Sequence, residues 1–237
     1  MKSYVIGTGW WCDGTGTHYN SKGNNSSDAT RQREFFPIWY AHIMAYANPK
    51  TIILVDSNSP VKPDFSSFDG VQVVDMLRNF PIGDKTCRNP FRTDATAAAR
   101  QMYVGAFYAY LTDVDYFIWV EQDCLIHGDN IIETALESMG DADMSAGRWD
   151  FQDYHMELSF LIMKASSVPH LFNSYLRSNR PKPEMKYWDV VHQDDVNFSW
   201  LPFGCGRMRP IDFTASHYYA QHLTDKEIEK FVEVLEA

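Results

Sequence analysis

The sequence has no long apolar run and no excess of positive charge, and each absence excludes a class of protein. The start, from Met1 to Gly7, lacks the apolar core of a signal peptide, and no later apolar run reaches membrane-spanning length. We therefore expect a cytoplasmic protein with no transmembrane segment. The formal net charge is −10. Because nucleic-acid backbones are bound mainly by clustered lysine and arginine, we expect no extended nucleic-acid surface.

Cysteine is scarce as well. Cys12, Cys87, Cys124 and Cys205 are scattered and form neither a CxxC nor a Cys/His ligand pattern. The sequence therefore indicates neither a zinc site nor a disulfide framework, and reduced thiols are expected. Aromatic residues, in contrast, are abundant, with 15 Phe, 13 Tyr and 7 Trp in 237 residues. This composition suits pockets for rings and sugars as well as a large core.

Short β-rich runs alternate with helical patterns along the chain, which is typical of βαβ units and a mainly parallel sheet. We expect an α/β fold with one domain over residues 1–237, and a polar loop from Gly7 to Asp28 that is either functional or disordered. The expected strands are 4–6, 51–55, 71–74, 116–120, 158–163 and 210–213, and the expected helices are 35–46, 98–109, 131–139, 168–176, 190–200 and 224–235.

The run from Tyr116 to Asp123 places two carboxylates at the end of a strand. Its continuous apolar part predicts a strand that is covered on both faces, and ligands of parallel sheets bind beyond the carboxyl ends of the strands. Glu121 and Asp123, two residues apart, point the same way if the strand geometry continues. Carboxylate oxygens suit Mg²⁺ or Mn²⁺. The alternative interpretation is a solvated acidic turn.

Two further motifs have competing interpretations. Gly7-Thr8-Gly9 follows the first strand, but the third glycine of a dinucleotide fingerprint would fall at Cys12, so a dinucleotide site is not favoured. The adjacent acids Asp194 and Asp195 repel each other, which suits a metal site or a general base. Asp194 alternatively caps a helix, with Asp195 in its first turn.

The order of these motifs resembles the GT-A glycosyltransferases, particularly the inverting enzymes of family 2. In that family the second strand commonly ends V-D-D-G-S, a helix carries A-R-N, the metal motif is D-x-D, and a later E-D-x-D segment includes the base. The corresponding stretches in this chain begin at Val55, Ala99, Glu121 and Asp194, and the resemblance spans about Tyr4 to Trp200.

The resemblance implies a donor site for a nucleotide-diphosphate sugar. By position, Asp56 matches the residue at the nucleotide-base pocket and Arg100 matches a basic residue near the diphosphate. Thr8 of the Gly-Thr-Gly turn, Glu121 and Gln122 are grouped with the donor-binding residues. Arg31 and Arg33 are candidates to approach a phosphate or an acceptor, although a solvated helix start explains them as well.

The resemblance also implies a divalent cation, Mn²⁺ or Mg²⁺, held by Asp123 and by a late histidine. His217 is the first choice for this histidine and His222 the alternative. Asp195 matches the catalytic base, with Asp194 beside it. The chain departs from the family where Glu121 replaces Asp, where Asp194 replaces Glu, and where Asn197 replaces the later Asp of E-D-x-D.

The implied activity is a metal-dependent, inverting transfer of a sugar to an acceptor hydroxyl, on a glycan or another molecule. The enzymatic alternative is a sugar nucleotidyltransferase, which usually carries a glycine-rich basic signature near the first strand, whereas residues 7–12 contain no Lys or Arg. The other alternative is a nucleotide- or carbohydrate-binding module without turnover. Two acidic clusters argue against it, because binding alone needs no base beside a metal.

Overall fold

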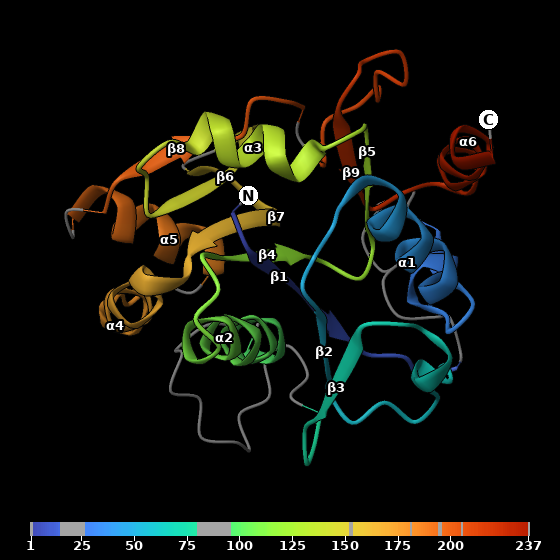
Figure 1. Cartoon of the computed structure of the whole chain (residues 1–237), viewed down its shortest axis with the longest axis horizontal. Helices are drawn as coiled ribbons and strands as arrows, with labels where there is room; N and C mark the ends of the chain where they lie inside the picture. The colour runs from blue at the N-terminus through green and yellow to red at the C-terminus, as the bar shows by residue number, and fades with distance from the viewer. Residues whose placement is uncertain are drawn as a thin grey trace.

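The computed structural model describes residues 2–14, 27–79, 96–151, 154–180, 182–193, 196–204 and 206–236. Seven strands in these ranges form a sheet in the order β3-β2-β1-β4-β7-β6-β8, and two more form a small antiparallel sheet, β5-β9 (Figure 1). The strands are β1 Tyr4–Trp10, β2 Ile52–Asp56, β3 Val71–Asp75, β4 Tyr116–Val120, β5 Cys124–His127, β6 Met144–Phe151, β7 Tyr154–Lys164, β8 Phe198–Trp200 and β9 Tyr218–Gln221.

The sheet is mixed and mainly parallel. β1 runs parallel to β2 and β4, and β2 parallel to β3, whereas β7 is antiparallel to both β4 and β6. β1, β2 and β4 are buried along their whole length, as expected for apolar strands covered on both faces. The predicted α/β fold is therefore confirmed.

Helices cover both faces of the sheet. α1, α3 and α6 pack with one set of strand side chains, and α2, α4 and α5 pack with the alternate set (Figure 1). The helices are α1 Phe35–Tyr46, α2 Thr96–Leu111, α3 Ile131–Met139, α4 Val168–Arg177, α5 Pro183–Gln193 and α6 Asp225–Glu236, with 3₁₀ turns η2 Asp28–Arg31, η3 Phe65–Ser67 and η4 Ala165–Ser167. Within the ranges that the structure describes, every helix is too short or too polar to cross a membrane.

Helix α6 begins where its local sequence predicts, whereas two other predicted elements differ from the structure. Thr224 and Glu227 form the expected capping box of α6, since the Thr224 hydroxyl accepts from the Glu227 amide and the Glu227 carboxylate accepts from the Thr224 amide. The prediction of a helix over 190–200 was wrong at Phe198–Trp200, which pairs with β6 as β8. The strand expected at 210–213 was also wrong, and the chain forms β9 further on, at Tyr218–Gln221.

His42 of α1 is buried between the sheet and α6. Its Nδ1 lies 3.1 Å from the Ile126 carbonyl oxygen, and its ring meets that of Phe231 edge-on at 5.4 Å. Burial lowers the pKa of His42 to about 4, with a smaller contribution from His127. The imidazole is therefore neutral in the folded state, whereas the unfolded chain binds a proton below a pH of about 6.5.

We expect the folded state to lose stability as the pH falls from about 6.5 towards 4, because the unfolded state takes up the proton first. Between pH 7 and pH 5, His42 should account for about 2 kcal/mol of the free energy of unfolding. Urea denaturation at the two pH values measures the free energy of unfolding. The drop in this free energy from pH 7 to pH 5 should be smaller in His42→Leu than in the wild type. Ile43→Val, a truncation of the next buried side chain of α1, should lower stability by about 1 kcal/mol at both pH values. A pH slope unchanged in His42→Leu would contradict the assignment.

Candidate functional site

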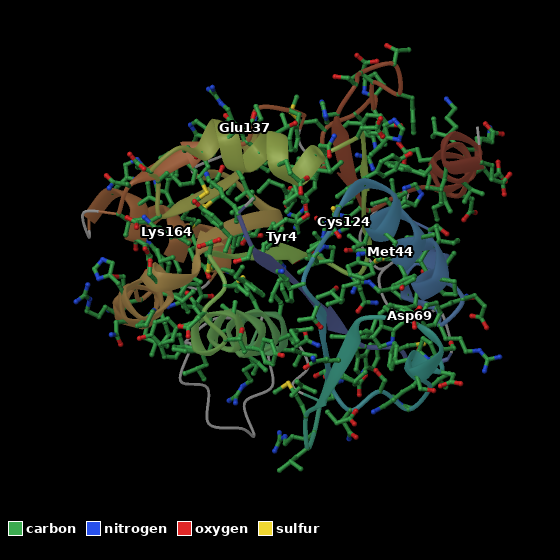
Figure 2. The ribbon with its side chains drawn as sticks, viewed as in Figure 1. Tyr4, Met44, Asp69, Cys124, Glu137 and Lys164 are labelled. Carbon is green, nitrogen blue, oxygen red and sulfur yellow. The ribbon has the colours of Figure 1, made fainter. Side chains whose placement is uncertain are left out.

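The carboxyl ends of β1, β2 and β4 lie at one edge of the sheet, which we call the carboxyl edge. Trp10 at the end of β1 is in register with Asp56 at the end of β2, and Glu121, Gln122 and Asp123 follow β4 directly. Figure 2 shows Cys124 and Lys164 on opposite sides of Tyr4. Cys124 is the residue after Asp123, and Lys164 ends the antiparallel strand β7. The two acids predicted from the strand pattern thus stand where parallel sheets bind ligands.

The small sheet brings a distant segment to these acids. β5 starts directly after Asp123 and pairs with β9, with Cys124 opposite Gln221. Gln221 and the residue after it, His222, therefore lie beside Asp123 although about a hundred positions separate them in the chain. His222 has a φ of 56°, a left-handed conformation that turns the chain at this point.

Asp123 is the centre of the cluster. It is 2 % exposed, its Oδ1 accepts from Gln221 Nε2 at 3.1 Å, and its Oδ2 accepts from Arg31 Nη2 at 2.8 Å. His222 Nε2 lies 3.8 Å from the same Oδ2. Burial alone would raise the pKa of Asp123, but Arg31, His222 and Gln221 together hold it below its usual value. Asp123 is therefore a buried carboxylate that stays charged.

Glu121 differs from Asp123 in charge. Its carboxylate accepts a hydrogen bond from Gln221 Nε2, and its backbone carbonyl accepts from Trp39 Nε1 at 3.1 Å. Burial, and then the nearby negative charge of Asp123, raise the pKa of Glu121 to about 8. At neutral pH the proton of this acidic pair therefore stays mainly on Glu121, and Asp123 carries the negative charge.

A second ion pair, between Arg207 and Glu157, contacts the cluster through Gln221. Arg207 Nε donates to Gln221 Oε1 at 3.0 Å and lies 3.2 Å from Glu157 Oε2. Glu157, on β7, is completely buried, and burial raises its pKa although Arg207 opposes the change. Arg207 Nη1 also lies 3.9 Å from Glu184 Oε1, in the first turn of α5. Arg207 therefore orients the Gln221 amide that binds both acids.

The donor atoms at Asp123 fit a hard divalent cation in part. Within the described ranges no group of three or more His, Cys, Asp or Glu side chains is arranged to hold a metal by itself. Asp123 and His222 supply a carboxylate and an imidazole, and burial lowers the pKa of His222, so this imidazole is neutral as a metal ligand must be. Mg²⁺ usually takes one or two protein ligands and completes its shell with phosphate and water.

The structure does not bring His217, the first choice from the sequence, to Asp123. His217 precedes β9 and His222 follows it, so the four-residue strand separates them by roughly 14 Å. His217 Nε2 lies 2.9 Å from the Asp129 carbonyl oxygen, and its Nδ1 lies 3.2 Å from the Ser216 hydroxyl. His222, the alternative, is the histidine at the carboxyl edge.

Asp56 and Arg100 both lie towards the carboxyl edge. Asp56 is completely buried, and its Oδ2 accepts from the Ser59 amide at 3.0 Å and from Lys62 Nζ at 2.8 Å. Its Oδ1 is buried and has no hydrogen-bond partner among the described residues. Arg100 precedes Gln101, whose amide donates to the carbonyl oxygens of Trp10 and Val55 where β1 and β2 end. Gln101 thus fixes this part of α2 against the edge.

Thr8 and Gln122 are placed inside the fold. Thr8 is completely buried within β1, and the glycines beside it serve packing. A Cβ on Gly7 would approach Phe117 to 2.4 Å, and one on Gly9 would approach Gln101 equally closely. The Gln122 side chain accepts from the Trp11 amide at 2.9 Å and donates to the Trp11 carbonyl oxygen. Thr8 is enclosed in β1 and the Gln122 amide is bonded to Trp11, so neither enters the site proposed below.

Asp194 and Asp195 lie outside the described residues, so the predicted catalytic base is not seen. Their described neighbour Asn197 contacts Asp143, with its carbonyl oxygen 2.8 Å from the Asp143 amide. Asp143 precedes β6, and its carbonyl oxygen accepts from Lys164 where β7 ends, which is the edge opposite to Asp123. The end of α5 that approaches the carboxyl edge is its first turn, with Glu184.

Sequence reasoning missed Glu157, Glu184, Arg207 and Gln221. Glu157 had a signal, since it is an acid inside the apolar run from Met156 to Met163. Gln221 and Arg207 had none, because each acts through a contact that the pairing of β5 with β9 creates.

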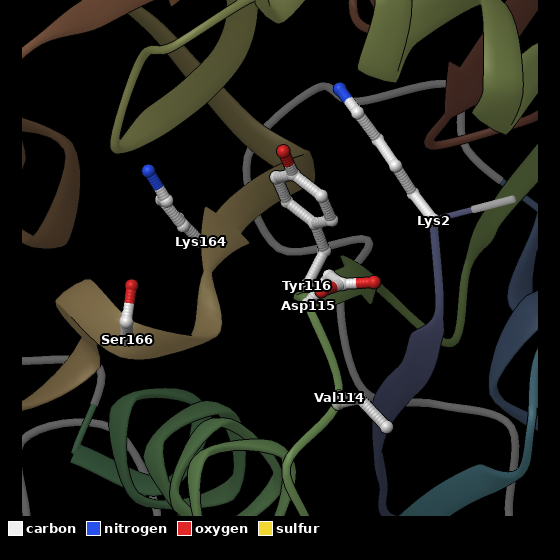
Figure 3. A pocket seen from close by; sticks show the side chains of 6 residues that line it. All are labelled: Lys2, Val114, Asp115, Tyr116, Lys164 and Ser166. Carbon is white, nitrogen blue, oxygen red and sulfur yellow. The ribbon is translucent and has the colours of Figure 1, made fainter.

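A cavity of about 470 Å³ lies at the other end of the sheet (Figure 3). Lys2, Asp115, Tyr116 and Lys164 line it, at the starts of β1 and β4 and the end of β7. Lys2 Nζ donates to the Leu136 carbonyl oxygen, and Asp115 accepts from the Ser3 amide. This cavity is thus remote from the acids of the carboxyl edge.

Comparison with known proteins identifies the fold. No protein-family model matches the chain, and no curated protein matches it. Among solved structures, the inositol-1-phosphate CTP transferase from T. maritima is 10 % identical with a TM-score of 0.53, over 100 % of this chain and 97 % of that chain. TarS from S. aureus, residues 1–349 in complex with UDP, is 8 % identical with a TM-score of 0.52, over 99 % of this chain.

The chain spans less than two thirds of some of these structures. It covers 64 % of the TarS chain. It covers 45 % of the glycosyltransferase GlyE from Streptococcus pneumoniae, to which it is 12 % identical, with a TM-score of 0.46 over 85 % of this chain. At such identities the likeness concerns the fold alone. The chain has a GT-A-like, Rossmann-like α/β fold.

Proposed function

We propose that this protein is a metal-dependent glycosyltransferase that moves a sugar from a nucleotide-diphosphate sugar to an acceptor hydroxyl with inversion. The observation that carries the proposal is the Asp123 carboxylate, buried yet charged, with the His222 imidazole 3.8 Å from its Oδ2 at the carboxyl edge. A structural ion pair alone would not need a neutral imidazole at the same oxygen.

The donor would lie along the carboxyl edge, with its base near β2 and its diphosphate near β4. Asp56, whose buried Oδ1 lacks a hydrogen-bond partner in the described structure, is the residue that the resemblance assigns to the base pocket. Arg31 and Arg100 would share the phosphate charge. Asp123 and His222 would hold Mn²⁺ or Mg²⁺, which neutralises the leaving diphosphate.

Two acids compete for the role of proton acceptor. The resemblance predicts Asp195. The described geometry supports Glu184, whose Oε1 lies 3.9 Å from Nη1 of Arg207, the arginine that binds Gln221 beside Asp123. Glu157 is completely buried and would not reach an acceptor. An acid at Glu184 would take the proton of the hydroxyl as it attacks the anomeric carbon.

A sugar nucleotidyltransferase is the second candidate, and the likeness to the CTP transferase over nearly the full length of both chains favours it. Such enzymes usually carry a glycine-rich basic signature near the first strand. Here Gly7, Thr8 and Gly9 belong to buried β1, and residues 7–12 contain no Lys or Arg. The glycosyltransferase therefore remains our proposal.

A thermal-shift panel tests the proposal, with UDP-, GDP-, CMP- and dTDP-sugars, each with Mn²⁺ or with EDTA. We expect one nucleotide class to raise the midpoint by roughly 5–10 °C at a hundredfold excess over its Kd, and only with Mn²⁺, since ligand binding to the folded state stabilises it by about 2.7 kcal/mol. The absence of any Mn²⁺-dependent shift would contradict the proposal. A shift with nucleoside triphosphates, together with pyrophosphate release from a sugar 1-phosphate, would establish the nucleotidyltransferase instead.

A further inference from the structure

The two carboxylate oxygens of Asp123 have different neighbours. Oδ1 accepts from Gln221 Nε2, whereas Oδ2 faces both Arg31 Nη2, at 2.8 Å, and His222 Nε2, at 3.8 Å. The oxygen that a cation would share with His222 is thus the oxygen that Arg31 holds. A guanidinium and a divalent cation that share one oxygen repel each other, so each would weaken the binding of the other.

We infer that Arg31 and the divalent cation compete for Asp123 Oδ2, and that Arg31 transfers to the donor phosphates when the cation binds. The inference rests on the proposed function and deepens it, because it assigns Arg31 as a diphosphate-binding residue that is coupled to the metal. Guanidinium binds carboxylate and phosphate with the same bidentate geometry, so the exchange replaces one anionic partner with another.

The surroundings indicate which partner moves. Asp123 is 2 % exposed and is held by Gln221, which Arg207 holds in turn against the buried Glu157. The Arg31 side chain is 30 % exposed and extends from the last residue of the 3₁₀ turn η2, outside the sheets. The carboxylate is therefore the fixed partner, and the long, partly exposed arginine is the one that can move.

A cation would replace the positive charge that Arg31 withdraws. Asp123 is a charged, buried carboxylate whose basic partner is Arg31. A buried carboxylate is unfavourable unless it is paired with a positive charge, so a cation would have to take the place of Arg31 when Arg31 leaves. Phosphates would in turn provide the new partner for Arg31.

Mn²⁺ binding to the whole chain tests the exchange, followed by the electron paramagnetic resonance signal of free Mn²⁺. Without nucleotide, we expect Arg31→Ala to bind Mn²⁺ about tenfold more tightly than the wild type, because the competing charge is gone. With saturating Mn²⁺, we expect the same variant to bind UDP, or whichever nucleoside diphosphate the thermal-shift panel selects, about tenfold more weakly. The two effects have opposite signs, which mere loss of structure would not produce.

Three further variants make the experiment specific. Arg33→Ala removes a neighbouring arginine that is paired with Glu34, and it should bind Mn²⁺ like the wild type. Arg31→Lys keeps a positive charge and should restore most of the competition. Asp123→Asn, added to Arg31→Ala, should abolish the tighter binding. If Arg31→Ala does not fold, judged by its thermal transition, Arg31→Gln replaces it.

The outcomes separate the inference from the function on which it rests. If the wild type binds Mn²⁺ together with the nucleotide but Arg31→Ala binds Mn²⁺ alone no more tightly, the exchange is wrong and the metal-dependent function stands. If Mn²⁺ binds to none of the proteins, with or without nucleotide, both are wrong. Tighter binding that survives Asp123→Asn would place the metal elsewhere and would also overturn the exchange.

Discussion

Asp123→Asn is expected to lower kcat/KM by about 10³-fold and to abolish the Mn²⁺-dependent thermal shift with the nucleotide-sugar donor. Asparagine keeps the shape of the side chain but removes the negative charge that Arg31, and in the proposal the cation, require. Gln221 would still bond to the remaining carbonyl oxygen. The variant should therefore fold and should fail specifically in binding metal and donor.

A matched control is Asp129→Asn. Asp129 is an exposed acid in the turn before α3, so the substitution makes the same chemical change outside the cluster. We expect it to keep wild-type turnover and the wild-type thermal shift. Mn²⁺-dependent donor binding that persists in Asp123→Asn would remove Asp123 from the metal site.

Glu184→Gln is expected to lower kcat by about 10²-fold or more while the donor still binds, because a general base contributes about 10²–10⁴ to the rate. Glutamine has the size of glutamate and keeps an oxygen near Arg207, but it accepts no proton. Wild-type turnover in this variant would exclude Glu184.

Asp195→Asn is the parallel variant, and Glu229→Gln, an exposed acid of α6, is the control. We expect Asp195→Asn to lower turnover less than Glu184→Gln. If Asp195→Asn alone abolishes turnover and spares donor binding, the base is the residue that the family resemblance predicts, and Glu184 only pairs with Arg207.

Features that depend on short stretches of chain were predictable. The strand Tyr116–Val120 and the helix Ile131–Met139 have the predicted bounds, since an unbroken apolar run and a regular apolar period are local signals. The capping box of α6 is local in the same sense. From the strand and its parallel neighbours, the position of Asp123 at the carboxyl edge followed directly.

Features that depend on pairing were not predictable. Which of the two histidines, His217 or His222, lies beside Asp123 depends on the register of β5 with β9, in which Gln221 faces Cys124. The Gly-Thr-Gly motif looked like a turn, yet its glycines are required by the side chains of Phe117 and Gln101 on other elements. Both outcomes rest on contacts between segments about a hundred residues apart, which no local pattern encodes.

By itself, the sequence determined the α/β fold class and the carboxylate at the end of β4, because hydrophobic periodicity decides which segments are buried and where they end. Only the tertiary structure decided which groups surround that carboxylate. Gln221, His222 and Arg31 reach Asp123 through the pairing of β9 with β5 and the placement of η2. These partners keep Asp123 the charged member of the acidic pair against the effect of burial, and they act through space and not along the chain.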